Sequence, residues 1–160
     1  KGYVPAVRLD SGEVLTEAGT ILQYLADQKP EKKLIPAFGT KERYKAMEWL
    51  NFVSSELHKG FGAYFIAPRL TPNTAEEMKG IWKTRMTERM NFVSDHLSKN
   101  QFFMGDQFTV VDAYAFTVMG WCKHIGFDLS PWPKIMGYME NVATRPSVQA
   151  ALAEEGLAKK

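Results

Sequence analysis

The spacing of apolar residues changes once along this chain of 160 residues, and that change limits the folds it can adopt. Before residue 29, two short apolar runs flank Asp10-Ser11-Gly12-Glu13, which is favourable chemistry for a hairpin turn. Residues 29–38 contain two prolines and three lysines with little periodicity, and they predict a linker. Beyond residue 38 the apolar residues recur at the three- and four-residue steps of helices.

This division predicts a mostly helical α+β chain. Residues 1–28 hold the end of an α/β domain, residues 29–38 a linker, and residues 39–160 an all-helical domain. A hairpin alone is marginally stable in water, so we expect this one to belong to a larger sheet. The chain begins with Lys1 rather than Met, and we expect the other strands to come from a preceding segment or from another chain.

The amino-acid composition limits the kinds of ligand and partner that this protein is expected to bind. The formal net charge is +2, from 20 Lys and Arg against 18 Asp and Glu, which is too balanced to favour nucleic acid or an anionic membrane. The single cysteine, Cys122, excludes an intrachain disulfide and suits a reducing cytosol. The three histidines are scattered and no cysteine pairs with them, so we expect no metal site.

The segment from Val4 to the predicted helix start at Glu17 is a candidate site for a peptide-like ligand. Val4 precedes Pro5 and is biased towards an extended conformation, in which an N–H and C=O outside the sheet can bond another backbone. The Glu17 carboxylate can hold the amine of a zwitterion, and the amides of the helix start can hold its carboxylate. The same residues also fit an ordinary hairpin followed by a first-turn helix charge.

A long helix is predicted after Thr40, and it carries two different stripes. The first stripe is apolar and predicts a core face; its members are Met47, Leu50, Leu57, Phe61 and Tyr64. The second stripe is polar or small; its members are Glu48, Asn51, Ser55, His58 and Gly62. His58 is compatible with a structural helix histidine, or with a group that hydrogen-bonds a thiol, a thiolate or a bound water.

Two capping boxes predict further helix starts. Thr74-Ala75-Glu76-Glu77 predicts a helix that lasts to about Leu97. Thr109-Val110-Val111-Asp112 predicts a second start, onto which Phe108 can fold as a hydrophobic staple. That helix is almost wholly apolar through Trp121 and is expected to be the buried central one. Short helices are expected after Pro131 and Pro146.

Trp121 and His124 are three residues apart and share a helix face. They fit core packing, or the wall of an apolar co-substrate pocket with Phe61 and Phe65 opposite. Cys122, between them, is expected to be a buried small hydrophobe.

Taken in order, these pieces resemble the glutathione transferase family, and the capping box with its staple is similar to a folding motif of that superfamily. More narrowly, the chain resembles the bacterial beta class over nearly its whole length. The segments that carry this resemblance are Glu48-Trp49-Leu50-Asn51, Ser55-Glu56-Leu57-His58-Lys59-Gly60-Phe61, Gly105-Asp106-Gln107-Phe108-Thr109-Val110-Val111-Asp112-Ala113-Tyr114, Arg145-Pro146-Ser147-Val148-Gln149-Ala150 and Glu155-Gly156-Leu157.

The resemblance implies a thioredoxin-like first domain and a set of glutathione-binding residues. Val4 holds the cysteinyl backbone of glutathione through its N–H and C=O, and its bond to Pro5 is cis. Glu17 and Ala18 hold the γ-glutamyl end. His58 lies beside the thiol, and Lys59 follows it as in the family. Asn51, Ser55 and Glu56 match positions that complete the site, some of them across a dimer interface.

The activity implied is transfer of glutathione to apolar electrophiles in a bacterial cytosol, by a detoxifying homodimer, with glutathione-dependent thiol–disulfide chemistry beside it. Glutathione is then a substrate, and no metal is needed. The beta class also carries a cysteine near its N-terminus that contacts the glutathione sulfur, in a segment that does not occur between residues 1 and 160. We therefore expect the 160 residues alone to hold half of a site. The alternative expectation is a non-catalytic relative that binds a ligand or a protein.

Overall fold

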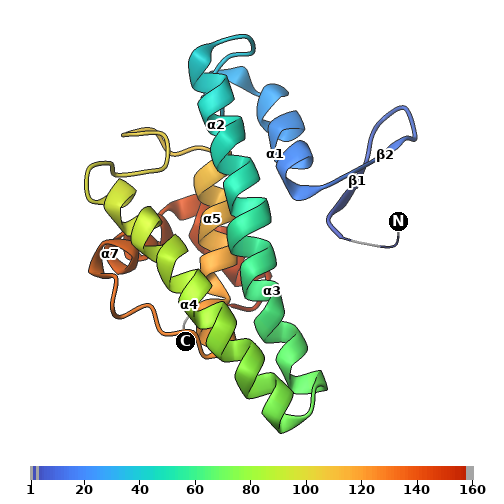
Figure 1. Ribbon diagram of the computed structural model, residues 1–160. Helices are drawn as coiled ribbons and strands as arrows, with labels where there is room; N and C mark the ends of the chain where they lie inside the picture. Colours follow the sequence, from blue (N-terminus) through green and yellow to red (C-terminus); the bar gives the residue numbers. More distant parts are fainter. Residues whose placement is uncertain (1, 3, 158–160) are drawn as a thin grey trace.

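The computed structural model describes residue 2 and residues 4–157, and most of this part of the chain is helical (Figure 1). The elements in order are β1 (Ala6–Arg8), β2 (Val14–Thr16), α1 (Ala18–Asp27), the 3₁₀ turn η1 (Pro30–Lys32), α2 (Lys41–Phe52), the π-helix η2 (Val53–His58), α3 (Lys59–Ile66), the 3₁₀ turn η3 (Ala67–Arg69), α4 (Pro72–Leu97), α5 (Val110–Gly120), α6 (Cys122–Ile125), α7 (Pro133–Ala143) and α8 (Pro146–Glu154).

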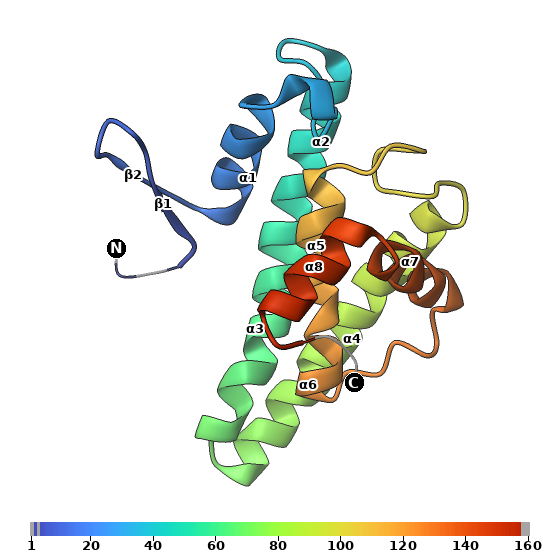
Figure 2. The same ribbon diagram turned by 180° about the vertical axis from the view of Figure 1, so that it is seen from behind.

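The predicted hairpin is confirmed. Strands β1 and β2 are antiparallel, with Val7 opposite Leu15 at the centre of the register. Gly12 supplies a φ of +88° in the turn, a conformation that an L side chain rarely adopts, and its N–H donates to the carbonyl of Leu9 at 2.9 Å. Both ribbon views show the hairpin beside α1 and away from the other helices (Figures 1 and 2).

Helices α2, η2 and α3 run on from one another as a single rod, against which α4 packs (Figure 1). Helix α5 lies in the middle of the helical part and contacts α1, α2, η2, α6 and α7. The side chains of Val111, Ala115 and Val118 on α5 have no exposed surface, which confirms the prediction of a buried central helix. Seen from behind, α8 covers another side of α5 (Figure 2).

The predicted capping box at the start of α5 is confirmed. The N–H of Thr109 donates to the Asp112 carboxylate at 2.8 Å, and the Thr109 hydroxyl accepts from the N–H of Val111 at 3.3 Å. Asp112 is fully buried and also accepts from the N–H of Phe103 at 2.9 Å and from the Tyr138 hydroxyl at 3.2 Å. Burial raises the pKa of Asp112, and its hydrogen bonds partly offset that rise.

The predicted N-cap of α4, Thr74, is wrong by three residues. The helix begins at Pro72, with Thr71 as its N-cap, and the Thr71 and Thr74 hydroxyls lie 2.9 Å apart. Proline suits the first helical position because the N–H that it lacks would have no intrahelical acceptor there. The predicted end at Leu97 is confirmed. In the predicted apolar stripe of the long helix, Met47 is 36% exposed and belongs to the surface rather than to the core.

An ion pair between a buried arginine and an exposed aspartate joins α1 to α2. The two terminal nitrogens of Arg43 each donate to one oxygen of Asp27 at 2.8 Å, and Arg43 is only 4% exposed. One of those nitrogens also donates to the carbonyl of Pro36 at 3.2 Å. The guanidinium lowers the pKa of Asp27. The bond therefore ties three parts of the chain together: α1, the segment after it, and α2.

Candidate glutathione site

The long helix widens into the π-helix η2 between Val53 and His58. The N–H of Lys59 bonds the carbonyl of Ser54, five residues earlier, which is the spacing of a π turn. The insertion changes which side chains point at α5, since an α-helix of the same length would place them on other faces. Short π segments of this kind are frequent at functional sites.

The half-buried ring of His58 is fixed by two aromatic side chains. Its Nδ1 lies 2.8 Å from the Tyr114 hydroxyl, and its ring meets Trp121 edge to face at a centroid distance of 4.8 Å. Burial and the neighbouring Lys59 charge lower the pKa of His58 below its usual value. The imidazole is therefore neutral near pH 7.

Tyr114, on α5, connects His58 to the start of α1. Its hydroxyl bonds Nδ1 of His58 at 2.8 Å, and a hydrogen bond with the Ser54 side chain lowers the pKa of Tyr114. Burial raises the pKa of Tyr114, and the negative charge of Glu17 raises it further. Sequence reasoning missed both Tyr114 and Ser54. Tyr114 lies two residues after the capping box, but no spacing rule links it to a histidine 56 residues away.

Glu17 is the N-cap of α1 and has an unusual backbone. Its φ of 74° is rare for a residue other than glycine and costs conformational energy. Its side chain makes no capping bond to α1, while its carbonyl accepts from the N–H groups of Thr20 and Ile21. The first two N–H groups of the helix, at Ala18 and Gly19, follow Glu17 directly in the chain. A carboxylate residue and amide donors therefore occur at one helix start.

Val4 and Pro5 precede the hairpin. The Val4–Pro5 peptide bond is cis, as the resemblance implies. The sheet ladder begins at Ala6, so Val4 lies outside it, and Val4 is 91% exposed.

The remaining predicted glutathione residues do not all gather at His58. Asn51, Ser55 and Lys59 are exposed, and the Ser55 hydroxyl donates to the Asn51 carbonyl at 2.9 Å. The Glu56 carboxylate accepts from Arg89 of α4 at 2.9 Å and lies 3.5 Å from Arg85. The two arginines lower the pKa of Glu56. Glu56 therefore faces α4, whereas His58 faces α5.

The predicted co-substrate wall needs one correction. Phe65 is 49% exposed and meets Trp121 edge to face at 5.6 Å, and Trp121 in turn contacts His58. His124 is exposed on α6. Phe61, however, has no exposed surface, because its ring packs inward against Phe127 at a centroid distance of 5.4 Å. Phe61 is a core residue, and the aromatic surface consists of Phe65 and Trp121.

Two hollows lie elsewhere on the molecule. One, of about 420 Å³, lies between α1, α5 and α8, and the other, of about 540 Å³, lies beside Cys122 and α7. The Cys122 thiol is buried, and burial raises its pKa to about 12. Over residues 4–157, we find no group of three His, Cys, Asp or Glu side chains that could hold a metal ion. In the same range, no helix is long and apolar enough to cross a membrane.

Comparison with known proteins identifies the family. Residues 52–146 match the family described as glutathione S-transferase, C-terminal domain. Glutathione S-transferase GstA of Escherichia coli O157:H7 is 40% identical over 157 residues, which cover 98% of this chain and 76% of GstA.

Two solved structures extend this likeness to the fold. A sphingomonad glutathione S-transferase complexed with glutathione is 38% identical, with a TM-score of 0.88 over 98% of this chain and 76% of the other. The bacterial beta class glutathione S-transferase of Sphingomonas chungbukensis is 42% identical, with the same TM-score and the same coverage.

The similarity covers both the hairpin with α1 and the helices that follow. The predicted fold class is thereby confirmed: the end of a thioredoxin-like domain precedes an all-α domain. The relatives are named as transferases, which does not favour a non-catalytic role. The chain belongs to the glutathione S-transferase family, and its function is that of a glutathione S-transferase.

Proposed function

We propose that glutathione lies along the line from the start of α1 to His58. Its γ-glutamyl end contacts Glu17 and Ala18, its cysteinyl backbone contacts Val4, and its sulfur lies beside His58. The observation that carries this proposal is Tyr114, which bonds His58 and lies within electrostatic reach of Glu17. The two ends of the proposed site therefore meet on one side chain.

The chemistry of the α1 start matches the γ-glutamyl group. That group carries an ammonium and a carboxylate on one carbon. The ammonium pairs with the Glu17 carboxylate, and the carboxylate accepts from the N–H groups of the first turn, where the helix dipole favours negative charge. The exposed backbone of Val4, outside the ladder and next to Pro5, offers the cysteinyl residue an extended partner.

The proposed role of His58 is to stabilise the sulfur of glutathione as a thiolate. A thiolate is the nucleophile in glutathione transfer, so a group that stabilises the thiolate at pH 7 accelerates the reaction. The neutral imidazole of His58 can donate one hydrogen bond, and the Lys59 side chain adds a positive charge nearby. The electrophile then lies on the aromatic surface of Phe65 and Trp121, with His124 at its edge. Aromatic rings suit loose recognition of varied apolar molecules.

A direct test measures glutathione binding by calorimetry and conjugation to an activated aryl chloride by absorbance. His58→Ala should lower the turnover severalfold while circular dichroism and the melting temperature stay near those of the wild type. An unfolded variant would instead assign His58 to the structural core. Unchanged turnover in a folded variant would remove His58 from the mechanism.

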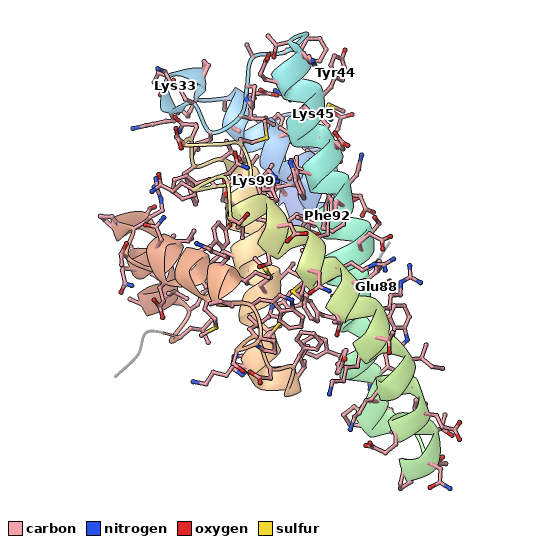
Figure 3. The ribbon with its side chains drawn as sticks, turned by 60° about the vertical axis from the view of Figure 1, so that its left-hand side comes forward. Lys33, Tyr44, Lys45, Glu88, Phe92 and Lys99 are labelled. Atoms are coloured by element: carbon pink, nitrogen blue, oxygen red, sulfur yellow. The ribbon has the colours of Figure 1, made fainter. Side chains whose placement is uncertain are left out.

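We further propose a homodimer that pairs through α2 and α4. Figure 3 shows Tyr44 and Lys45 of α2 and Glu88 and Phe92 of α4 on one face. Phe92 is 54% exposed and packs against Trp49 at 5.6 Å and Phe52 at 5.3 Å, which makes an aromatic patch with charged side chains around it. This composition, with an apolar centre and a polar rim, is that of a protein interface.

The dimer also explains the position of Asn51, Ser55 and Glu56. Glu56 faces α4 rather than His58, so a role in glutathione binding requires the site of a second subunit. Light scattering should give twice the chain mass for the wild type and the single mass for Phe92→Glu. Met136→Glu, at an exposed methionine of α7, is the matched control and should stay dimeric.

Three finer assignments follow from the resemblance to the beta class. The first domain ends at residue 28 and the helical domain begins at residue 39. The enzyme works in the cytosol, where it detoxifies electrophiles. It also reduces small disulfides with glutathione. The similarity to the beta class transferase of Sphingomonas chungbukensis supports this set. Assay of a mixed disulfide beside the aryl chloride measures which activity dominates.

A further inference from the structure

Three polar side chains form a hydrogen-bonded series that ends at His58. The series runs from Ser54 of η2 to Tyr114 of α5 and back to His58 of η2. The Tyr114 hydroxyl has one proton to donate, and Nδ1 of His58 lies 2.8 Å from it. The lone pair of a neutral imidazole nitrogen is a stronger acceptor than a hydroxyl oxygen, so the Tyr114 proton is directed to Nδ1 and the phenol oxygen is left to accept from Ser54, in keeping with the lowering effect of Ser54 on the pKa of Tyr114.

The direction of these bonds decides the tautomer of His58. A neutral imidazole carries one proton, on one of its two nitrogens. If Nδ1 accepts from Tyr114, the proton lies on Nε2. The ring cannot turn freely, because its faces and edges meet Tyr114 and Trp121 at centroid distances of 5.8 and 4.8 Å.

We propose that Tyr114 and Ser54 are positioning residues that hold His58 in the Nε2–H tautomer, so that His58 donates a hydrogen bond to the glutathione sulfur and does not act as its base. The part concerning the sulfur rests on the proposed function above; the tautomer does not. An Nε2 that already bears a proton has no lone pair to remove one from the thiol. The thiol proton therefore leaves to solvent, and His58 stabilises the thiolate that remains.

Glu17, which is proposed to hold the γ-glutamyl end of glutathione, acts on this series through its charge. Its negative charge acts on Tyr114 and disfavours loss of the phenol proton. The ammonium of the γ-glutamyl group offsets that charge when it pairs with Glu17. Tyr114 then becomes a stronger donor to His58 at the moment when the sulfur arrives.

The test is nitrogen–proton NMR of the imidazole rings in ¹⁵N-labelled protein. The signals of His58 are identified as those that His58→Gln removes, since the chain has three histidines. The wild type should show His58 as a single Nε2–H tautomer at pH 7.5. Tyr114→Phe should give a mixture of the two tautomers, and Ser54→Ala a smaller change in the same direction.

Tyr64→Phe is the matched control. The Tyr64 hydroxyl is buried and has no hydrogen-bond partner, so its removal should leave the His58 signals unchanged. An Nδ1–H tautomer in the wild type would overturn the proposal and make His58 a base. Unchanged His58 signals in Tyr114→Phe would overturn it as well. Should Tyr114→Phe fail to fold, Ser54→Ala applies the same criterion.

Kinetic measurements test the second part of the proposal, that His58 donates a hydrogen bond to the glutathione sulfur. Tyr114→Phe should lower kcat about tenfold, the scale of one charge-assisted hydrogen bond, with KM for glutathione within about twofold. Addition of glutathione should shift the Nε2–H proton signal of wild-type His58. A fixed Nε2–H tautomer without that shift would overturn the placement of glutathione and leave the tautomer assignment standing.

Discussion

Two helices of this protein begin at a carboxylate, and the two carboxylates are used in opposite ways. At the start of α5, Asp112 is fully buried and accepts from Thr109, Phe103 and Tyr138 within 3.2 Å. At the start of α1, Glu17 is exposed, does not cap its helix, and sits at a φ of 74°. Asp112 accepts its hydrogen bonds from groups that hold the fold together. Glu17 has a strained backbone and directly precedes the N–H groups of the first turn of α1.

The comparison teaches how to separate structural from ligand-binding carboxylates at helix starts. Asp112, the structural carboxylate, completes the capping box of its helix. Glu17, the carboxylate proposed to bind the ligand, makes no side-chain cap and has a φ of 74°, a backbone cost that the rest of the fold must sustain. Four predictions challenge this distinction, from the largest expected effect to the smallest.

Asp112→Ala should give the largest loss of stability. It leaves the buried N–H groups of Phe103 and Thr109 without their acceptor, each at a cost of about 1–3 kcal/mol, while the Tyr138 hydroxyl keeps the backbone carbonyl of residue 112, 3.3 Å away. We expect the free energy of unfolding, measured with urea, to fall by at least about 3 kcal/mol. Asp106→Ala removes an exposed carboxylate of the same loop and should stay within about 0.5 kcal/mol of the wild type. Equal losses in the two variants would contradict the structural role of Asp112.

Glu17→Gln should affect binding rather than folding. It removes the charge opposite the γ-glutamyl ammonium, and a hydrogen bond to a charged group contributes about 1.5–3 kcal/mol. Calorimetry should therefore show glutathione affinity reduced about tenfold or more, at unchanged thermal stability. Glu13→Gln, in the hairpin, is the control. Affinity within twofold of the wild type would remove Glu17 from the site.

Glu17→Gly should separate strain from charge. Glycine adopts a positive φ at little steric cost, so the variant is relieved of backbone strain. We expect this gain to exceed the cost of the greater entropy that glycine gives the unfolded chain, so that stability rises by about 0.5–1 kcal/mol. The variant should lose glutathione affinity, because the carboxylate is gone. Lys33→Gly relieves a φ of 51° in η1 and should gain stability with no effect on affinity. A Glu17→Gly variant that is less stable than the wild type would show that this backbone stores no strain.

The smallest effect is in the pH dependence of stability. Because the pKa of His58 is lowered in the folded state, the unfolded chain binds that proton first as pH falls. The free energy of unfolding should therefore decrease as pH falls below the usual histidine value, and His58→Gln should lack this component. The raised pKa of Asp112 acts in the opposite sense, at the lower pH where carboxyl groups titrate. A steeper slope in His58→Gln than in the wild type would reverse the assigned direction.

Sequence patterns correctly predicted the features that depend on interactions between residues close together in the chain. The box of Thr109 and Asp112 is readable because both partners lie within one turn. The hairpin is readable because Gly12 must adopt a positive φ. At α4, the capping-box pattern placed the start at Thr74, although Pro72 suits a first helical position and marks the actual start.

Longer-range features could not be read in this way. Nothing in the residues Val53–His58 signals a π turn, although this turn sets the faces of the helix on which Ser54 and His58 lie. Helical spacing correctly placed Phe61 in the core stripe, but it also allowed Phe61 in the co-substrate wall, and only the packing of Phe61 against Phe127 excludes that second position. The arginines of Glu56 come from a helix 33 residues away along the chain.

The pair of Arg43 and Asp27 has a consequence for how the molecule opens. Because the pair joins α1 to α2 through the buried Arg43 guanidinium, α1 should unfold together with the helical bundle, although its sequence position assigns it to the first domain. The hairpin, with its exposed strands, should open on its own at a much lower free energy. In hydrogen exchange, the amides of α1 would then follow those of α2. The boundary of cooperative unfolding would fall between Thr16 and Ala18, at the residue that is proposed to hold the ligand.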